Sequence, residues 1–431
     1  MSQSFRQPSR YEPTWHSPAD QYRLHNTMSY DDPLIPDPSY HSSAASNSLV
    51  IHPEVKRLQS KKKLPWLEIV GSGIGILGML ATIVLVGYQT SVSESILAII
   101  AALFPMFVVV GTLVWIDRWE PEPKWLLLLA FLWGAGVATT LSLFANYAGQ
   151  QYLTSYLPLG DSVESATATF VAPLIEETMK GLGVALILLA NRKRINSPLD
   201  GVVIAGILAA GFAFTENVLY FARFADVLVI IFFMRAVLSP FVHTIFTSMT
   251  GLAIALGLTR SQNRWSWLWM LPIGWMSAVG LHGLWNGVAS YMSQQFLPLY
   301  ALFWLPLFIT WLILNIIVSV KQRRWVVVGL EALVHAGWIH PMEARMLSSL
   351  PLRRIARRQS KRYGKRAKKA MADFQQKTTE LALTYVTDLH TGRTEKEDRY
   401  FREQLEAMVA MRNKYDEAMQ ASQARYVLGV R

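Results

Sequence analysis

The sequence contains no cysteine in its 431 residues and has few charged side chains. The missing cysteine excludes a disulfide scaffold, an iron–sulfur protein and an enzyme with a thiol nucleophile, and it leaves only His, Asp and Glu as ligands for a zinc site. Charged residues make up 16% of the chain, against about 25% in soluble domains. This shortage argues against a simple soluble enzyme. The 52% of hydrophobic residues argues equally against a chain that is disordered throughout.

The excess of positive charge is confined to one end of the chain. Residues 321–431 carry 23 of the 41 Lys and Arg and 12 of the 30 Asp and Glu, which gives this region a net charge of +11. The preceding 320 residues hold 18 basic and 18 acidic groups and are neutral. The charge therefore separates a neutral, apolar part from a basic C-terminal region.

Long apolar runs fill the neutral part. We read eight spans, at 66–89, 95–116, 125–147, 167–190, 201–221, 227–258, 265–292 and 297–320. Most are long enough to cross a hydrocarbon core of about 30 Å, and inside lipid they must be helices because no water satisfies the backbone. The predicted fold class is all-α, a polytopic membrane protein of about eight transmembrane helices over residues 65–320. The sixth span is over-long, so we expect it to be tilted, kinked near Pro240 or extended beyond the bilayer.

Basic residues predict the orientation of these spans. They precede the first span, follow the last, and occur in the 2–3, 4–5 and 6–7 loops, whereas 148–166 and 293–296 contain none. Because Lys and Arg favour the cytoplasmic side, we expect a multi-pass protein of the cell membrane with both termini in the cytoplasm. Residues 1–60 are rich in Ser, Pro, His and Tyr without an apolar period, which predicts a disordered cytoplasmic segment.

The C-terminal region, 321–431, is predicted to be basic, mainly helical and cytoplasmic. Ten Lys and Arg fall within 353–369, and apolar residues follow helical spacing at Phe401, Leu405, Met408, Tyr415 and Met419. Anionic lipid headgroups are the expected partner of the basic run, at about 1 kcal/mol per charge. Nucleic acid is the alternative partner, and a solvated helix face that only obeys the positive-inside rule is the plainest interpretation.

Few ionisable side chains lie inside the predicted spans, where each is costly and marks a functional site by default. They are Glu176, Glu177, Lys180, Glu216, Arg235, His243 and His282. Counted from the nearest cytoplasmic loop, Glu176, Glu216 and the two histidines lie 15 to 18 residues into their spans. At about 1.5 Å per residue this is roughly 22–27 Å. A shared level on four helices predicts a single site.

Two carboxylates and two imidazoles allow hydrolysis by two routes. In the first, the histidines and a carboxylate bind a divalent metal such as Zn²⁺, and another glutamate is the general base. In the second, no metal takes part: a buried glutamate activates water, and His and Asn stabilise the oxyanion. A proton- or ion-coupled transporter that uses the same carboxylates is the main alternative to an enzyme, although no inverted repeat between the two halves of the spans supports it.

Within these routes the residues receive predicted roles. Glu176 or Glu177 is expected to activate water, and the other glutamate to pair with Lys180 or a neighbouring helix. The predicted metal ligands or electrostatic stabilisers are Glu216, His243 and His282. Asn286 lies one helical turn after His282 and is the expected helper. Arg235 is expected either to pair with Glu216 or to extend its charged end toward the membrane surface.

The segments that carry these residues resemble the motifs of the PrsW family of intramembrane proteases, which is distantly similar to the CAAX-processing and bacteriocin-protection proteases. Residues 176–180, Glu-Glu-Thr-Met-Lys, resemble its Glu-Glu-x-x-Lys motif. Residues 212–217, Phe-Ala-Phe-Thr-Glu-Asn, resemble its Phe-x-x-x-Glu-Asn motif, and 243–247 and 282–286 resemble its two later His segments. The acidic, proline-containing stretch 117–123 is also similar to the one that precedes the catalytic helices in this family.

The resemblance covers about residues 65–320 and implies a bacterial intramembrane endopeptidase. Its substrates would be membrane-tethered proteins, including regulators such as anti-sigma factors. It implies catalytic roles for Glu176, Glu177, Glu216, His243 and His282. Residues 1–60 and 325–431 fall outside the shared core, so the resemblance implies nothing about them.

Overall fold

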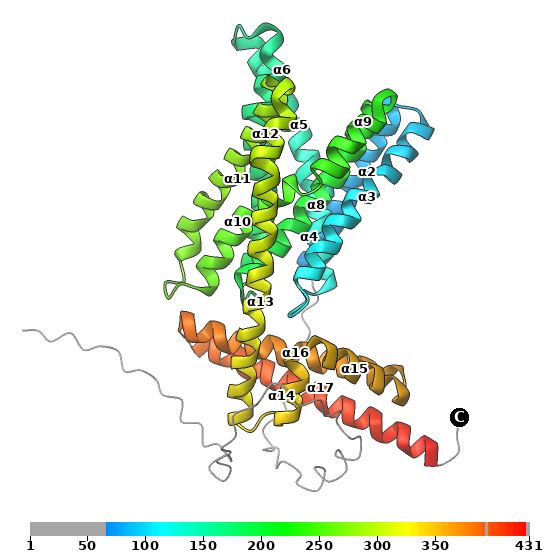
Figure 1. Cartoon of the computed structure of the whole chain (residues 1–431), viewed down its shortest axis with the longest axis vertical. Helices are drawn as coiled ribbons and strands as arrows, with labels where there is room; N and C mark the ends of the chain where they lie inside the picture. The colour runs from blue at the N-terminus through cyan, green and yellow to red at the C-terminus, as the bar shows by residue number, and fades with distance from the viewer. Residues whose placement is uncertain (1–65, 393–394, 428–431) are drawn as a thin grey trace, which may run out of the picture.

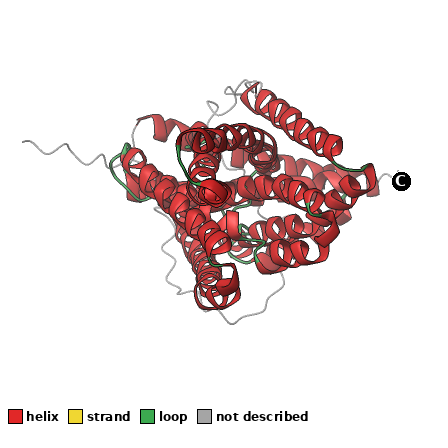
Figure 2. Ribbon diagram, turned by 90° about the horizontal axis from the view of Figure 1, so that it is seen from above, coloured by secondary structure: helices red, strands yellow, loops and turns green. Residues whose placement is uncertain are grey.

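The computed structural model describes residues 66–392 and 395–427. Helices joined by short loops make up these residues, and no strand occurs among them (Figure 2), which confirms the all-α prediction. The segment 1–60, predicted to be disordered, lies outside the described residues. Long, steep helices form one part of the molecule, and a group of helices lies across their axis at one end (Figure 1).

Each predicted span falls on a helical stretch. In chain order the stretches are α2 (Trp66–Gln89), α3 (Val92–Ile116), α4–η4–α5 (Lys124–Tyr156), α6–η6–α7 (163–190), α8 (Pro198–Arg223), α9–η8 and α10 (228–259), α11 (Ser266–Tyr291), and α12–η10–α13 (296–335). Five described stretches are long and apolar enough to cross a membrane: Val92–Ile116, Lys124–Tyr156, Pro198–Arg223, Ala225–Thr259 and Ser293–His335. The chain is therefore a multi-pass membrane protein, and the count of eight spans remains a prediction.

Four of the stretches contain a π-helical segment between α-helical parts. These segments are η4 (Trp133–Ala138), η6 (Thr167–Val171), η8 (Phe233–Leu238) and η10 (Tyr300–Trp304). They join α4 (Lys124–Leu132) to α5 (Thr139–Tyr156), α6 (Val163–Ala166) to α7 (Ala172–Ala190), α9 (Leu228–Phe232) to the turn before α10, and α12 (Phe296–Leu299) to α13 (Leu305–His335). Such segments often occur next to functional sites, and here η6 leads into α7 and η8 precedes α10.

The predicted kink near Pro240 is a break in the helix. The segment η8 ends at Leu238, and α10 (Val242–Thr259) begins after a turn through Ser239 and Pro240. Proline has no N–H for a helix and clashes with the preceding turn, so the over-long sixth span is divided into two helical parts.

Glycines allow the central helices to touch. A Cβ atom on Gly201 of α8 would lie 2.2 Å from the carbonyl oxygen of Gly251 on α10, and a Cβ on Gly251 would lie 2.1 Å from the carbonyl oxygen of Gly201. Only a residue without a side chain fits at either position. The close approach is typical of membrane helices, whose association depends on van der Waals packing, and it fixes α8 and α10 as neighbours.

The C-terminal module consists of the end of α13 and the helices α14 (Pro341–Leu347), α15 (Leu350–Ser360), α16 (Lys365–Thr391) and α17 (Glu395–Val427). It has its own buried apolar cluster, to which Leu330 contributes from α13, Phe374 from α16, and Phe401, Leu405 and Met408 from α17. The helical spacing predicted for α17 is thus confirmed. The predicted boundary at residue 320 falls inside α13, which continues without a break from the bundle into the module.

Asn196 joins the module to the bundle. This buried residue lies in the loop between α7 and α8, and its Nδ2 donates to Glu120 Oε1 at 2.7 Å. On the other side, Thr384 of α16 donates to its Oδ1 at 3.1 Å, and Thr387 donates to its carbonyl oxygen at 2.6 Å. The loop that ends α7 and begins α8 is therefore held by the C-terminal module.

Several buried acids surround this junction. Asp117, Glu120 and Glu122 lie in the loop between α3 and α4, and Glu380 reaches them from α16. Burial, together with the neighbouring carboxylates, raises the pKa of each of the three loop acids well above its usual value. Arg194 lies 3.6 Å from Glu380 and supplies positive charge to the same place.

Candidate active site

Helix α7 presents three charged side chains to the interior of the bundle. Glu177 is fully buried, and its Oε1 lies 2.7 Å from Lys180 Nζ and 3.0 Å from His282 Nδ1. Its Oε2 accepts a hydrogen bond from Thr247 of α10 at 2.9 Å. Both oxygens are thus occupied, so Glu177 holds three helices, α7, α10 and α11, in a fixed relation.

Lys180 is the buried cation of the site. Its Nζ lies 2.7 Å from Glu177, 3.7 Å from Glu176 and 3.4 Å from His243 Nδ1. The ammonium also lies 3.9 Å above the centre of the Phe212 ring. A buried charge is tolerated only with such partners, and this one stabilises two adjacent carboxylates that would otherwise repel each other.

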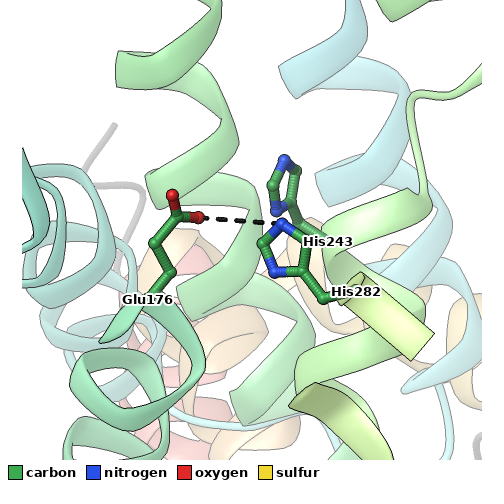
Figure 3. A group of neighbouring side chains, drawn as sticks. All are labelled: Glu176, His243 and His282. Atoms are coloured by element: carbon green, nitrogen blue, oxygen red, sulfur yellow. Dashed lines mark ion pairs between the residues drawn. The ribbon is translucent and has the colours of Figure 1, made fainter. Parts of the chain in front are cut away.

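Glu176 differs from its neighbour in how it is bound. Its Oε1 accepts a hydrogen bond from Asn146 of α5 at 3.2 Å, whereas its buried Oε2 has no hydrogen-bond partner. That free oxygen lies 3.9 Å from His282 Nε2 (Figure 3). This oxygen meets only the more distant charges of Lys180, at 3.7 Å, and His282. A buried carboxylate oxygen that accepts no hydrogen bond calls for an explanation, such as a ligand or a catalytic role.

Glu176, His243 and His282 form one compact group. Each residue offers one ligand atom, and these atoms all lie within 4.8 Å of one another. The three come from α7, α10 and α11, and Figure 3 shows the carboxylate facing the pair of imidazole rings. Two histidines and one carboxylate are a common ligand set for catalytic zinc. The residues present therefore fit a divalent metal.

A second carboxylate supports each histidine. Glu177 accepts from His282 Nδ1, and Glu216 of α8 lies 2.8 Å from His243 Nε2. Since a carboxylate accepts only from an N–H, Nδ1 of His282 and Nε2 of His243 carry the proton. The remaining nitrogen of each ring then keeps a lone pair, which on Nδ1 of His243 faces Lys180 Nζ at 3.4 Å. This arrangement of carboxylate, imidazole and ligand position recurs around metal-binding histidines.

Arg235 fixes Glu216 in turn. Its Nη2 lies 2.5 Å from Glu216 Oε2, its Nε donates to Asn217 Oδ1 at 2.7 Å, and its guanidinium lies 4.0 Å over the Tyr220 ring. The expected pairing of Arg235 with Glu216 is confirmed. Arg235 comes from η8, before the break at Pro240, so this segment is tied to the site through Glu216 and His243.

A small cavity lies beside His243. It has a volume of about 20 Å³, room for about one water molecule, and its wall includes Asn217 of α8, Arg235 of η8, Pro240 of the break and Trp285 of α11. A second hollow on the α3 side shares Asn217 and Pro240 with it. The space beside the imidazole is therefore bounded by polar side chains and by the broken part of the sixth span.

The structure brings together the residues predicted to share one level. Among the predicted catalytic residues, Glu176, Glu177, Glu216, His243 and His282 lie in one connected network. Asn286 has a different position: its Nδ2 donates to the carbonyl oxygen of Ala168 in η6 at 2.8 Å, which ties α11 to the start of α7. Its predicted role as a helper stays a prediction.

The metal-ligand prediction differs from the geometry in its carboxylate. Glu216 was expected to join the two histidines, but its Oε2 is engaged by Arg235 and by His243 Nε2, and the compact group contains Glu176 instead. The sequence does not predict Asn146 as a site residue, because it is neutral and the predicted site rests on ionisable side chains within the spans. The one signal available was its position as an amide within an apolar span.

Comparisons with known proteins point to one family. Residues 122–311 match the family described as PrsW family intramembrane metalloprotease. "Protease PrsW" of Clostridioides difficile (strain 630) is 32% identical over 165 residues, which cover 37% of this chain and 64% of that protein. "Protease PrsW" of Oceanobacillus iheyensis is 26% identical over 187 residues, which cover 43% of this chain and 80% of that protein. No solved structure matches the chain. The matched region includes every residue of the network.

Proposed function

Because residues 122–311 match the PrsW family of intramembrane metalloproteases, we propose that this chain belongs to that family and is an intramembrane endopeptidase that hydrolyses peptide bonds of membrane-tethered proteins. The observation that carries the proposal is the buried Oε2 of Glu176, which accepts no hydrogen bond and lies in one compact group with His243 and His282. The comparisons offer no support for a transporter. A regulatory protein such as an anti-sigma factor is the proposed kind of substrate.

The proposed cofactor is a divalent metal, with Zn²⁺ as the first candidate. His243, His282 and Glu176 would hold it, since their ligand atoms lie together. A metal in this position supplies Lewis-acid activation of water and of the substrate carbonyl. The buried surroundings, with Lys180 close to both glutamates, strengthen each of these electrostatic interactions.

Each side chain of the network has a separate role in the proposed reaction. In the route without a metal, Glu176 would take a proton from the attacking water, because its Oε2 accepts no hydrogen bond and its carboxylate faces both imidazoles. Glu177 orients His282, and Glu216 orients His243. Lys180 opposes the negative charge that develops on the substrate oxygen as water adds. Glu176 would be a ligand in the route with a metal and the base in the route without one, so activity depends on this residue in either case.

Single replacements test the proposal. Glu176→Gln, His243→Ala and His282→Ala should each abolish cleavage of a membrane-tethered reporter without lowering the amount of protein. Glu164→Gln, on the exposed part of α6, is the matched control and should cleave normally. Retained cleavage in all three site variants would contradict the proposal. Substrate-dependent proton flux in proteoliposomes without peptidase activity would favour the transporter instead.

The proposed topology follows the basic residues. Both termini lie in the cytoplasm, residues 65–320 form the protease core, and 321–431 form a cytoplasmic helical region. The bilayer is the first partner of the protein, and anionic lipid headgroups are the proposed partner of the basic C-terminal region. Nucleic acid is the less favoured partner of that region.

A further inference from the structure

A strip of basic side chains runs along one exposed side of the C-terminal module. We call it the basic strip; its members, all exposed, are Arg354, Arg358, Lys361, Arg362, Lys365, Arg366, Lys368 and Lys369. No Asp or Glu occurs in the sequence between Glu343 and Asp373. The strip extends over α15 and the first turn of α16. Nothing in the proposed peptidase chemistry uses it.

The start of α15 is anchored at the end of the membrane bundle. Arg353 is buried, and its Nε donates to the carbonyl oxygen of Leu347 at 2.7 Å, while its Nη1 donates to that of Trp119 at 3.1 Å. Trp119 lies in the loop just after α3. The neighbouring α16 adds a bond from Gln376 Nε2 to the carbonyl oxygen of Pro121, at 3.3 Å. The first turn of α15 is thus held against this loop.

Exposed tryptophans on either side of this loop indicate that it lies at the membrane–water interface. Trp115, near the end of α3, is 49% exposed, and Trp125, near the start of α4, is 41% exposed. Arg118 stacks on Trp115, with its guanidinium carbon 4.5 Å from the ring centre. Tryptophan and arginine side chains of this kind gather at lipid headgroups. Because Arg353 binds the backbone between these two tryptophans, α15 begins at headgroup level.

The direction of α15 suits a helix that lies on the membrane. Figure 1 shows α15 running across the axis of the long helices, beside the ends of α3 and α4. Ile355 is 43% exposed and lies next to two exposed arginines, Arg354 before it in the sequence and Arg358 about one helical turn after it. An exposed apolar side chain flanked by arginines is typical of interfacial amphipathic helices. A nucleic acid would gain nothing from this isoleucine, whereas a headgroup layer has an apolar boundary to receive it.

We propose that α15 and the basic strip bind anionic phospholipid headgroups in the plane of the bilayer, with Ile355 directed into the headgroup layer. The proposal deepens the partner named above and rests on the membrane topology, not on peptidase activity. Each basic residue near an anionic surface contributes about fivefold in affinity. Removal of three should therefore weaken the contact by about a hundredfold.

A fluorescent probe tests the position of α15. The chain has no cysteine, so Ile355→Cys gives a single labelling site for an environment-sensitive dye. The carrier is the full-length chain with Glu176→Gln, in nanodiscs of phosphatidylcholine alone or with 30% phosphatidylglycerol. We expect a blue shift, and quenching by a lipid-borne quencher, only in the anionic discs and only at low salt. Asn413→Cys, exposed on α17, is the control and should show neither. Equal signals at position 355 in both lipids would overturn the proposal.

Matched charge variants separate the basic strip from general electrostatics. In the Ile355→Cys chain, Arg354, Arg358 and Arg362 are changed together to Gln, and in a control Arg399, Arg402 and Lys414, exposed on α17, are changed in the same way. Both variants lose three charges. The first should abolish the blue shift and the second should preserve it; equal loss in both would overturn the proposal. Binding of a single-stranded RNA to the parent chain in neutral discs, with no binding to the first variant, would also overturn the proposal. Because the carrier lacks Glu176, failure here leaves the peptidase proposal standing.

Discussion

Replacement by Gln should affect a different property at each of the two adjacent glutamates of α7, stability at one and catalysis at the other. In Glu177→Gln the buried Lys180 loses the carboxylate at 2.7 Å and keeps only Glu176 at 3.7 Å as an anionic partner. In Glu176→Gln the oxygen that accepts from Asn146 can remain, and the oxygen that is changed makes no hydrogen bond. The first variant should therefore lose stability and the second should lose catalysis.

The size of the effect follows from the burial of the pair. Lys180 and Glu177 both have fully buried side chains. Breaking such a pair by removing one charge costs about 3–5 kcal/mol. The amide of Gln retains one acceptor, so we expect about 3 kcal/mol for Glu177→Gln. This is roughly a hundredfold in the folding equilibrium. For Glu176→Gln, which breaks no hydrogen bond at Oε2, we expect less than about 1 kcal/mol.

Unfolding and cleavage measured on the same samples separate the two roles. The chain has 15 tryptophans, so its intrinsic fluorescence reports unfolding in nanodiscs, and a membrane-tethered reporter measures cleavage. Glu176→Gln should unfold like the parent chain and be inactive, whereas Glu177→Gln should unfold under milder conditions. If Glu177→Gln matched the parent in stability while Glu176→Gln did not, the assignment of positioning and reacting carboxylates would be reversed.

Three further predictions concern the network around Glu216 and the junction between the bundle and the C-terminal module. Arg235→Gln should lower cleavage about 10- to 100-fold, because Glu216 loses its guanidinium partner, and Arg235→Lys should recover part of it in the reporter assay. Asn196→Ala should weaken docking of the C-terminal module by about 1–3 kcal/mol, seen as faster hydrogen exchange in α16 with the bundle unchanged. Burial raises the pKa of Glu120, so the folded state binds more protons than the unfolded one. Stability at the junction should therefore fall as pH rises from the ordinary glutamate pKa through the raised value. Glu120→Gln should flatten this pH dependence of stability, and an unchanged slope in that variant would refute the prediction.

Much of the bundle could be predicted from the sequence, because lipid imposes long apolar helices and makes charged residues conspicuous. The shared level of Glu176, Glu216, His243 and His282 was enough to place them in one site, and the four do meet across helices α7, α8, α10 and α11. The break at Pro240 is one of three outcomes expected from the length of the sixth span, and the missing proline N–H is its physical cause.

Other features could not be predicted because spacing gives a helix face but no side-chain rotamer. Glu176 and Lys180 are four residues apart, a spacing at which side chains pair on a helix, yet the shorter contact of Lys180 is the i,i+3 pair with Glu177. The choice of carboxylate beside the histidines depends on Arg235, which turns Glu216 toward His243 Nε2. No local pattern indicates such a competition between helices.

The junction with the C-terminal module also lies beyond the reach of sequence patterns. Thr384 and Thr387 contact Asn196 across 188 and 191 residues of chain. Threonines within a helix are common and predict no partner. Burial of the acids in the 117–123 loop depends equally on α16, which covers them from a distant part of the sequence.

The metal content of the purified, cleaving protein tests the central claim most directly. Mass spectrometry of the protein in nanodiscs should find about one zinc per chain, and chelation should remove both the metal and reporter cleavage until zinc is restored. His282→Ala should contain no zinc. Reporter cleavage by a protein that contains no metal and ignores chelators would contradict a metal centre formed by Glu176, His243 and His282.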